Sequence, residues 1–463
     1  MYSSGIEIPK VQFSLIAFSQ IEPGSFFLGF DLDNAGTLSK IDNTGTITVI
    51  EGGGSSIMIE DIGLGSTVRI NNCNSASSCS STVSGGYCNT ASGCRSTVSG
   101  GYVNAASYIY STVGGGIQNT ASGYISTVGG GGSNTASGYR STVSGGYVNT
   151  SSCNNSTVSG GRENTASGAY STVSGGYCNT ASSSSSTVGG GSQNTASGYC
   201  FSTVSGGVVN TASGAASTVG GGSQNTASGA VSTVGGGCNN TASGCSSTVG
   251  GGCSNTASNQ YSTVSGGKCN TASGCNSTVG GGCNNTSSSN SSTVGGGRNN
   301  TASGCRSTLS GGFCNTASGS YSTVSGGRSN TASGACSTVS GGFCNTASCG
   351  YSTVGGGVNN AASNIYSTVG GGVNNAVSGG YSTVGGGGCN TASGCRSFVA
   401  GGQCNNTNSC NDAMIVGSCI TADRACATFV NNLSIKSIPT SSAGLPSGSV
   451  WRCTADDTLR IVP

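Results

Sequence analysis

The stretch STVSGGYCNTASGCR, from Ser81 to Arg95, decides the fold. Its 15-residue frame recurs 23 times between residues 66 and 411, and one copy has 16 residues. The first place is always Ser and the ninth always Asn, the third is Val in 22 copies, and the fifth and sixth are Gly in 22. The seventh, eighth, fourteenth and fifteenth places vary freely. A fixed period of this kind is typical of a repeat architecture, in which neighbouring units stabilise one another.

Alternation inside the frame indicates β-structure. STVSG and NTASG are five-residue segments of period two, each closed by Gly or by a variable pair. A helical repeat would need about 33 residues. We therefore predict an all-β fold, a parallel β-solenoid with two short strands and two turns per coil and with small β modules capping both ends. Coils that stack about 4.8 Å apart would make 23 of them a rod of about 110 Å.

The alternation also assigns an inside and an outside to each coil. Val83 and Ala91 belong to the only recurrent apolar places, so we expect them inside, with Asn89 and its equivalents stacked as an internal ladder. Thr82 and the other Thr and Ser residues of alternate places would face outward. An interior of Val, Ala, Ser and Gly buries little apolar surface, which favours oligomerisation, cross-links or both.

The chain divides into three expected domains. Residues 1–65 form an N-terminal β-meander that docks or caps, residues 66–411 form the solenoid shaft, and residues 412–463 form a C-terminal β cap. The first part has a net charge of −6 and the shaft +8, because the shaft has a single acidic residue, Glu163. Strands are expected at 25–32, 37–42, 46–52, 413–416, 428–438 and 458–462, with turns at 34–36 and 43–45.

Composition excludes several classes of function. The chain has no histidine, which removes His-based acid–base catalysis and His-ligated metals. Charged residues are 6 % and the net charge is +2, which gives no case for binding nucleic acid. No apolar run approaches the ~20 residues that span a bilayer. We expect no enzyme activity, no cofactor and no metal site.

The frame G-x-x-N-T-A-S-G-x-x-S-T-V-S-G resembles the head repeat of trimeric autotransporter adhesins, the YadA-like head. This resemblance covers about three quarters of the chain and implies a left-handed parallel β-roll that assembles as a homotrimer. The ends resemble something else. LGFDLDNAGTLSKIDNTGTITVIEGG (28–53) and the segment from ADRACATFVNN (422–432) to SVWR (449–452) are similar to modules of phage and large-DNA-virus fibres.

Together the resemblances imply a structural fibre at the virion surface or another extracellular surface. The N-terminal module would attach it to the virion or to a cell-surface anchor, and the shaft would present an attachment surface to a host glycan or receptor. No heptad pattern follows the last frame, which favours a virion fibre over a bacterial cell-surface adhesin. A third hypothesis is an ice-binding solenoid, since Thr-x-Ser columns at about 4.8 Å on a flat sheet could order water.

Cysteines occupy the variable places of the frame. The chain has 25, of which 22 lie in the repeats. Residues one coil apart are about 4.8 Å apart, inside the disulfide range of roughly 4.4–6.8 Å. The alternative is that Cys is a tolerated small loop residue. The candidate disulfides are Cys73 with Cys88, Cys79 with Cys94, Cys238 with Cys253, Cys389 with Cys404, and Cys395 with Cys410.

Two further surface features deserve a hypothesis. Outward Tyr and Arg residues at the turns could form a ligand-facing stripe (Tyr87, Tyr102, Arg95, Arg140 and Arg306), although solvated decoration would produce the same pattern. Sequons also occur, many of which arise by chance in a chain so rich in Asn, Ser and Thr. The candidate glycosylation sites are Asn154, Asn239, Asn284, Asn299 and Asn405.

Overall fold

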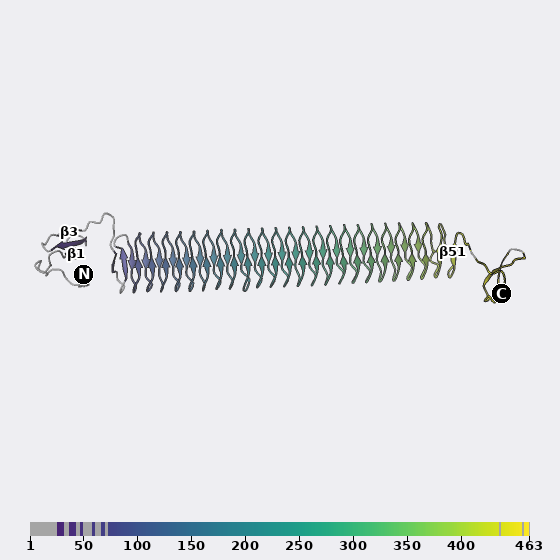
Figure 1. Cartoon of the computed structure of the whole chain (residues 1–463), viewed down its shortest axis with the longest axis horizontal. Helices are drawn as coiled ribbons and strands as arrows, with labels where there is room; N and C mark the ends of the chain where they lie inside the picture. Colours follow the sequence, from purple (N-terminus) through teal and green to yellow (C-terminus); the bar gives the residue numbers. More distant parts are fainter. Residues whose placement is uncertain are drawn as a thin grey trace.

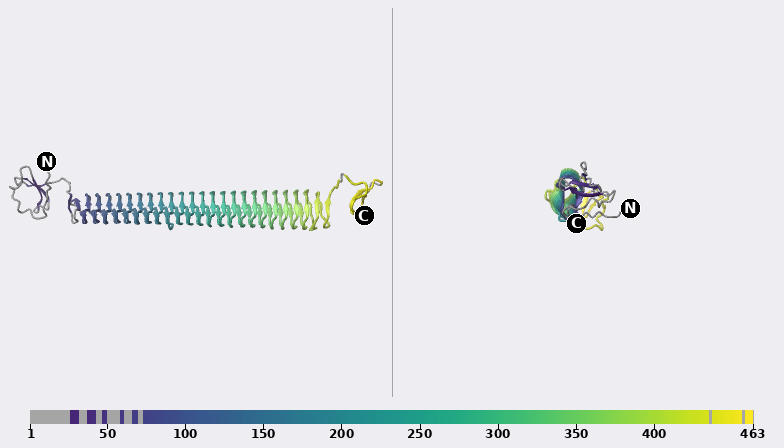
Figure 2. Two further views of the ribbon diagram at one scale, coloured as in Figure 1. Left: turned by 60° about the horizontal axis from the view of Figure 1, so that its bottom comes forward. Right: turned by 90° about the vertical axis from the view of Figure 1, so that its left-hand side faces the viewer.

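The computed structural model describes residues 26–31, 37–42, 47–49, 58–60, 66–69, 73–434, 437–455 and 458–462. Figure 1 shows a straight rod of stacked coils with a small β element near each end of the chain. Figure 2 shows the same rod nearly end-on, where the coils superpose into one narrow cross-section. The described residues contain strands and turns but no helix. The predicted all-β parallel β-solenoid is confirmed; the left-handed sense of the roll stays a prediction.

Two parallel ladders run along the rod. The first contains the second and third places of each frame, from β5 (Thr67–Arg69) to β49 (Phe398–Val399). The second contains the tenth and eleventh places, from β6 (Ser75–Ala76) to β48 (Thr391–Ala392). Each strand of the shaft is only two residues long between these ends, but every strand pairs in register with its equivalent one coil away. Stability therefore comes from stacking between coils rather than from any single strand pair.

Small side chains fill the coil interior in fixed columns. The first-place Ser, third-place Val, ninth-place Asn and eleventh-place Ala are buried, as Ser96, Val98, Asn104 and Ala106 illustrate. The second-place Thr, here Thr97 of β9 (Thr97–Val98), is half-buried on the outer side. The predicted assignment of inside and outside is confirmed, because successive side chains of a β-strand point to opposite sides.

The buried first-place hydroxyls form two groups. Where the thirteenth place of the preceding frame is not Gly, the hydroxyl donates to the carbonyl of that residue, as Ser111 Oγ does to Tyr108 O at 2.7 Å. Where the thirteenth place is Gly, many of these hydroxyls have no partner among the described residues. Ten serines belong to this second group: Ser96, Ser141, Ser171, Ser217, Ser232, Ser247, Ser277, Ser307, Ser322 and Ser337.

A third ladder, which the sequence did not predict, follows the seventh place. Single parallel bridges connect equivalent residues from Tyr87 to Gln403, coil after coil. The eighth and fifteenth places on either side of the strands adopt left-handed backbone conformations in residues of many types, for example φ 57° at Val103 and φ 57° at Tyr110. The sixth-place Gly also adopts a positive φ, for example +93° at Gly101.

The first ladder meets an antiparallel strand at its N-terminal end and extends past the repeated frames at its C-terminal end. At the N-terminal end β4 (Met58–Glu60) pairs antiparallel with β5 and so covers the edge that β5 would otherwise leave open. At the C-terminal end the ladder continues through β50 (Met414–Val416) and β51 (Thr428–Val430), so the solenoid has about 24 turns. The boundary expected at residue 411 is therefore wrong, because residues 412–430 complete the shaft rather than begin a separate cap.

The small modules contain short antiparallel sheets. β1 (Phe26–Asp31), β2 (Thr37–Asp42) and β3 (Ile47–Val49) form a three-stranded meander at the positions that the sequence indicated. The turns predicted at 34–36 and 43–45 lie outside the described residues. Near the C-terminus β52 (Val450–Arg452), which was not predicted, pairs with β53 (Leu459–Ile461).

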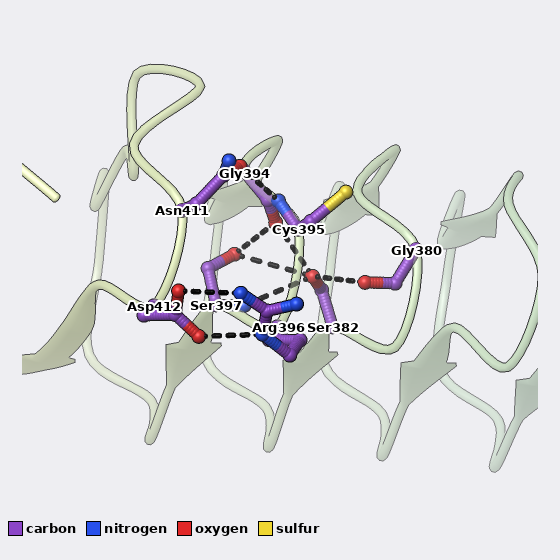
Figure 3. Close-up of polar contacts among 8 residues, drawn as sticks. All are labelled: Gly380, Ser382, Gly394, Cys395, Arg396, Ser397, Asn411 and Asp412. Atoms are coloured by element: carbon purple, nitrogen blue, oxygen red, sulfur yellow. Dashed lines mark hydrogen bonds and ion pairs between the residues drawn. The ribbon is translucent and has the colours of Figure 1, made fainter. Parts of the chain in front are cut away.

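The register of the frame changes at two places. In the 16-residue coil Phe201 occupies the fifteenth place, so the extra residue is Tyr199, which is 90 % exposed and bulges outward. Near the C-terminus Phe398 pairs with Met414, 16 residues on, because one extra residue enters the preceding turn. Figure 3 shows the consequence at this turn, where Cys395 N donates to Asn411 Oδ1 at 2.8 Å.

Candidate attachment edges of the solenoid

The variable residues lie on the two turns of each coil, which stack into two edges along the rod. The seventh-place edge is the column of seventh-place and eighth-place side chains from Cys73 to Cys404. The fifteenth-place edge is the column of fourteenth-place and fifteenth-place side chains from Cys79 to Arg396. Most side chains on both edges are exposed and most of the others are only half-buried, so the residues there are free to vary.

The turn under the seventh-place edge is held by the Asn ladder. Asn104 Nδ2 donates to Gly100 O at 2.9 Å and to Gly116 O, one coil on, at 2.8 Å. Its Oδ1 accepts from the backbone N–H of Asn119 at 2.9 Å. The turn also requires glycine, since a β-carbon on Gly116, where φ is +89°, would lie 2.1 Å from Gly131 O. The Asn and Gly residues together place the outward residues in straight register.

Aromatic and cationic side chains gather at three points of the seventh-place edge. Tyr87 and Tyr102 stack with ring centroids 5.5 Å apart. Farther along, Arg162 lies between Tyr147 and Tyr177, with its Cζ 6.0 Å and 5.6 Å from the two ring centroids. Contacts of this kind are worth about 0.5–1 kcal/mol at exposed sites and fix the position of the guanidinium group.

The third point is the longest array. Arg298 Cζ lies 5.8 Å from the Phe313 ring centroid. Arg328 Cζ lies 5.4 Å from the same ring and 5.5 Å from the ring of Phe343. Four consecutive coils therefore present guanidinium and phenyl groups in alternation.

Glu163 distinguishes the Arg162 cluster from this array. Arg162 Nε donates to Glu163 Oε1 at 2.9 Å, and Cys178 Sγ donates to Glu163 Oε2 at 3.2 Å. The hydrogen bond from Cys178, followed by that from Arg162, lowers the pKa of the Glu163 carboxyl. The same bond to Glu163 raises the pKa of the Cys178 thiol. This cluster is thus electrically balanced.

The fifteenth-place edge has its own clusters. Near the N-terminal end the Arg95 guanidinium donates to the Tyr110 hydroxyl and lies over its ring. Tyr110 meets Tyr124 edge-on at 6.0 Å, and Tyr124 stacks on Tyr139 at 5.2 Å. Arg140 closes this cluster, with its Cζ 5.0 Å from the Tyr139 centroid.

Nearer the C-terminal end of the same edge, tyrosines stack over three coils. The ring centroids of Tyr351 and Tyr366 are 4.8 Å apart, and those of Tyr366 and Tyr381 are 5.0 Å apart. Arg306 lies over Tyr321 and donates to its hydroxyl. Ring separations close to the coil spacing show that the backbone register, rather than the side chains, sets these stacks.

The single stripe expected from the sequence is therefore two stripes. Tyr87 and Tyr102 lie on the seventh-place edge, while Arg95, Arg140 and Arg306 lie on the fifteenth-place edge. A spacing of 15 residues among aromatic and basic residues was the signal that would have found other members. Those members include Tyr110, Tyr124, Tyr139, Arg298, Phe313, Arg328 and Phe343.

The cysteine columns have different outcomes. Cys79 and Cys94 form a disulfide, with Cα atoms 4.8 Å apart. Cys238 and Cys253 are neighbours on the seventh-place edge and form a parallel backbone β-bridge, but both are free thiols. Cys73 is also free, and it hydrogen-bonds Cys88, which raises the pKa of the Cys88 thiol.

Cys389 and Cys404, also free, belong to a longer column. Because the solenoid continues past residue 411, Cys419 occupies the next eighth place, with its N–H donating to Gln403 O at 2.7 Å. Burial, then Cys389 and Cys419, raise the pKa of the Cys404 thiol.

The pair Cys395 and Cys410 is a wrong prediction. The extra residue in the last turn places Asn411, not Cys410, beside Cys395, and the Cys410 thiol turns toward the carbonyl of Asn408. The 15-residue count fails here because the final copy of the frame, which contains Asn408 and Ser409 at φ 47° and 58°, makes a longer turn.

The candidate glycosylation sites also separate. Asn154, Asn239 and Asn284 are exposed and Asn299 is half-buried, so their amides remain candidates. Asn405 is excluded, because it is buried in the Asn ladder and its Nδ2 donates to Gly401 O and Gly417 O, both at 2.7 Å. A ninth-place Asn cannot bear a glycan without leaving the ladder.

Comparison with known proteins agrees with this geometry. A family model described as the Ubiquitous surface protein adhesin repeat matches residues 337–349, the first thirteen places of one coil. No curated protein sequence matches the chain. The match fits a YadA-like adhesin repeat, and with the β-solenoid it is consistent with a structural surface fibre or adhesin that is extracellular or exposed at a surface.

The described residues include no group of three or more His, Cys, Asp or Glu side chains placed to hold a metal ion. The same residues include no helix of the length and hydropathy needed to cross a membrane.

Proposed function

We propose that this chain is a non-catalytic surface fibre whose solenoid holds its two end modules apart and displays attachment edges. The observation that carries the proposal is the unbroken register of the shaft, which aligns side chains along straight edges from coil to coil. The first ladder and the Asn ladder supply the stiffness, and the turns supply the variable surface. Neither the edges nor the interior needs chemistry to serve this purpose.

The finer proposal is a virion fibre, anchored by the acidic N-terminal module. It is supported by the resemblance of both ends to phage and large-DNA-virus fibre modules and by the opposite charges of the N-terminal part and the shaft. Immunoelectron microscopy with antibodies to each end tests it. We expect both labels on virions, with the C-terminal label about 110 Å farther out. Labelling confined to bacterial or other cell envelopes would instead favour the cell-surface adhesin.

We also propose a homotrimer. The interior buries mostly small side chains, and the half-buried Thr rows of each ladder offer flat surfaces that a neighbouring chain can cover. Light scattering at micromolar concentration should give three times the chain mass of 44.4 kDa. A mass of one chain would refute the assembly and leave the spacer role intact.

The Thr rows also support a second candidate function, ice binding. Thr occupies the second place in 22 of the 23 frames, and its row is interrupted only at Phe398. Ice binding requires that row to be open to solvent, whereas a trimer would cover part of it. Thermal hysteresis of the purified protein, lost in a variant with Thr→Lys in the middle of the row, would establish this function; no hysteresis would remove it.

A further inference from the structure

Cations on the seventh-place edge are spaced at regular intervals in its C-terminal half. Lys268, Arg298 and Arg328 lie two coils apart in one column, and direct parallel bridges connect each coil to the next through Cys283 and Phe313. With coils 4.8 Å apart, as the Cα atoms of the disulfide show, successive cations are about 9.6 Å apart at the backbone. All three side chains are exposed.

The phenyl rings fix where these charges point. Phe313 is half-buried between the guanidinium groups of Arg298 and Arg328, and Arg328 also covers one side of Phe343. The rings therefore act as spacers and positioning groups, while the guanidinium edges remain available to solvent. A planar guanidinium whose stem and face are held in this way can offer paired N–H donors to a carboxylate or sulfate.

No carboxylate in the shaft competes for these cations. Between Glu163 and Asp412 the sequence contains no acidic residue. The ion pairs formed by arginines among the described residues involve Arg162, Arg396 and Arg424. The array at Arg298 and Arg328 thus differs from the balanced Arg162 cluster of the same edge, although both place guanidinium groups on aromatic rings.

We propose that the edge from Lys268 to Phe343 binds a linear acidic polysaccharide that has one anionic group per disaccharide. Charges on alternate coils, with neutral spacers between them, match a polymer whose charges recur on alternate sugars. A nucleic acid is a poorer match, because its charges recur far more densely, about every 3.4 Å along each strand, than a single row of three cations can follow. The proposal rests on the proposed function as an attachment fibre and names the ligand class of one of its edges.

The test uses the full chain and surface plasmon resonance on immobilised hyaluronan, which has one carboxylate per disaccharide, with neutral dextran and single-stranded poly(dT) as comparison surfaces. The double variant Arg298→Gln/Arg328→Gln should bind at least about tenfold more weakly, and the slope of log affinity against log salt should fall by about two. Arg162→Gln is the control, since it removes one guanidinium group from an aromatic cluster on the same edge, as each half of the double variant does. It should change the affinity less than about twofold, because Glu163 already neutralises Arg162.

Phe313→Leu separates positioning from charge. It retains both arginines and an apolar side chain, so it should weaken binding while the salt slope stays as in the wild type. Circular dichroism and rod length by electron microscopy establish that each variant is folded.

Three results would overturn the inference: equal losses in Arg162→Gln and the double variant, tighter binding to poly(dT), or no binding to hyaluronan at low salt. If no polysaccharide binds but antibodies still label a rod on the surface of the particle, the inference fails while the fibre function stands.

Discussion

The Asn ladder should be the most sensitive element of the shaft, and Asn225 tests this in mid-rod. Its Nδ2 donates to Gly221 O at 2.8 Å and to Gly237 O at 2.9 Å, and its Oδ1 accepts from Asn240 N at 2.9 Å. Asn225→Ala removes three hydrogen bonds at once and leaves their backbone partners in a part-buried turn. At about 0.5–1.5 kcal/mol for each bond, the coil should lose about 2–4 kcal/mol of local stability.

Hydrogen exchange measured by mass spectrometry is the suitable assay, because a rod of many coils does not unfold in one cooperative step. A loss of that size should speed amide exchange in the mutated coil and its two neighbours by about 30- to 700-fold. Distant coils should exchange as before. Gln224→Ala, one residue away but exposed, is the matched control and should change exchange little. If the two variants behave alike, the ladder does not stabilise the turn and the reasoning is wrong.

Four further outcomes are expected. Deleting residues 217–276, four whole coils, should shorten the rod by about 19 Å and preserve folding, whereas a seven-residue deletion within them should disrupt the ladder; the opposite result would refute the solenoid. Ser232→Ala removes a buried hydroxyl that has no partner among the described residues, so stability should stay unchanged or rise by up to about 1 kcal/mol. The Ser262 hydroxyl donates to a carbonyl, so Ser262→Ala should lower stability. Equal effects of the two substitutions would contradict this reasoning. Alkylation of the native protein should modify at most 23 of its 25 cysteines, and modification of all 25 would show that no disulfide forms. Hydrogen bonds from Arg396 lower the pKa of the Asp412 carboxyl, so this ion pair stabilises its turn at pH values above the pKa of an unfolded Asp. Protection of the turn from amide exchange should therefore fall as the pH drops below roughly 4. Asp412→Asn should abolish that pH dependence.

The interior of the shaft was predictable because one frame repeats so often. Val83, Ala91 and Asn89 each hold a place whose residue barely changes, and a two-residue alternation then determines which side of the strand it occupies. The β-meander of 26–49 was predictable for a local reason, because alternating segments between short turn sequences form hairpins.

The failures share a different cause. The position of Tyr199 outside the coil, and the displacement of Cys410 by Asn411, depend on which residue of a lengthened turn bulges outward. That choice follows from the left-handed conformation of the residue at the fifteenth place and from hydrogen bonds to the coil below. Neither appears in a count of residues. Asn405 illustrates the same limit, since a sequon describes three adjacent residues and not the ladder that buries the first.

The variable seventh-place and fifteenth-place edges of the rod follow from how its stability is distributed. Non-glycine residues in left-handed conformations, such as Val103 and Tyr110, cost roughly 1–2 kcal/mol each. This cost recurs in every coil. The backbone ladders and the Asn side chains offset the cost, and neither depends on the identity of the variable residues. A substitution at a turn therefore changes the surface without changing the scaffold. This separation explains how Cys283, Arg298 and Phe313 can follow one another in neighbouring coils while the ladder beneath them remains in register. It also means that the attachment chemistry of such a fibre can be altered one coil at a time, with the spacing between charges always a multiple of the coil rise.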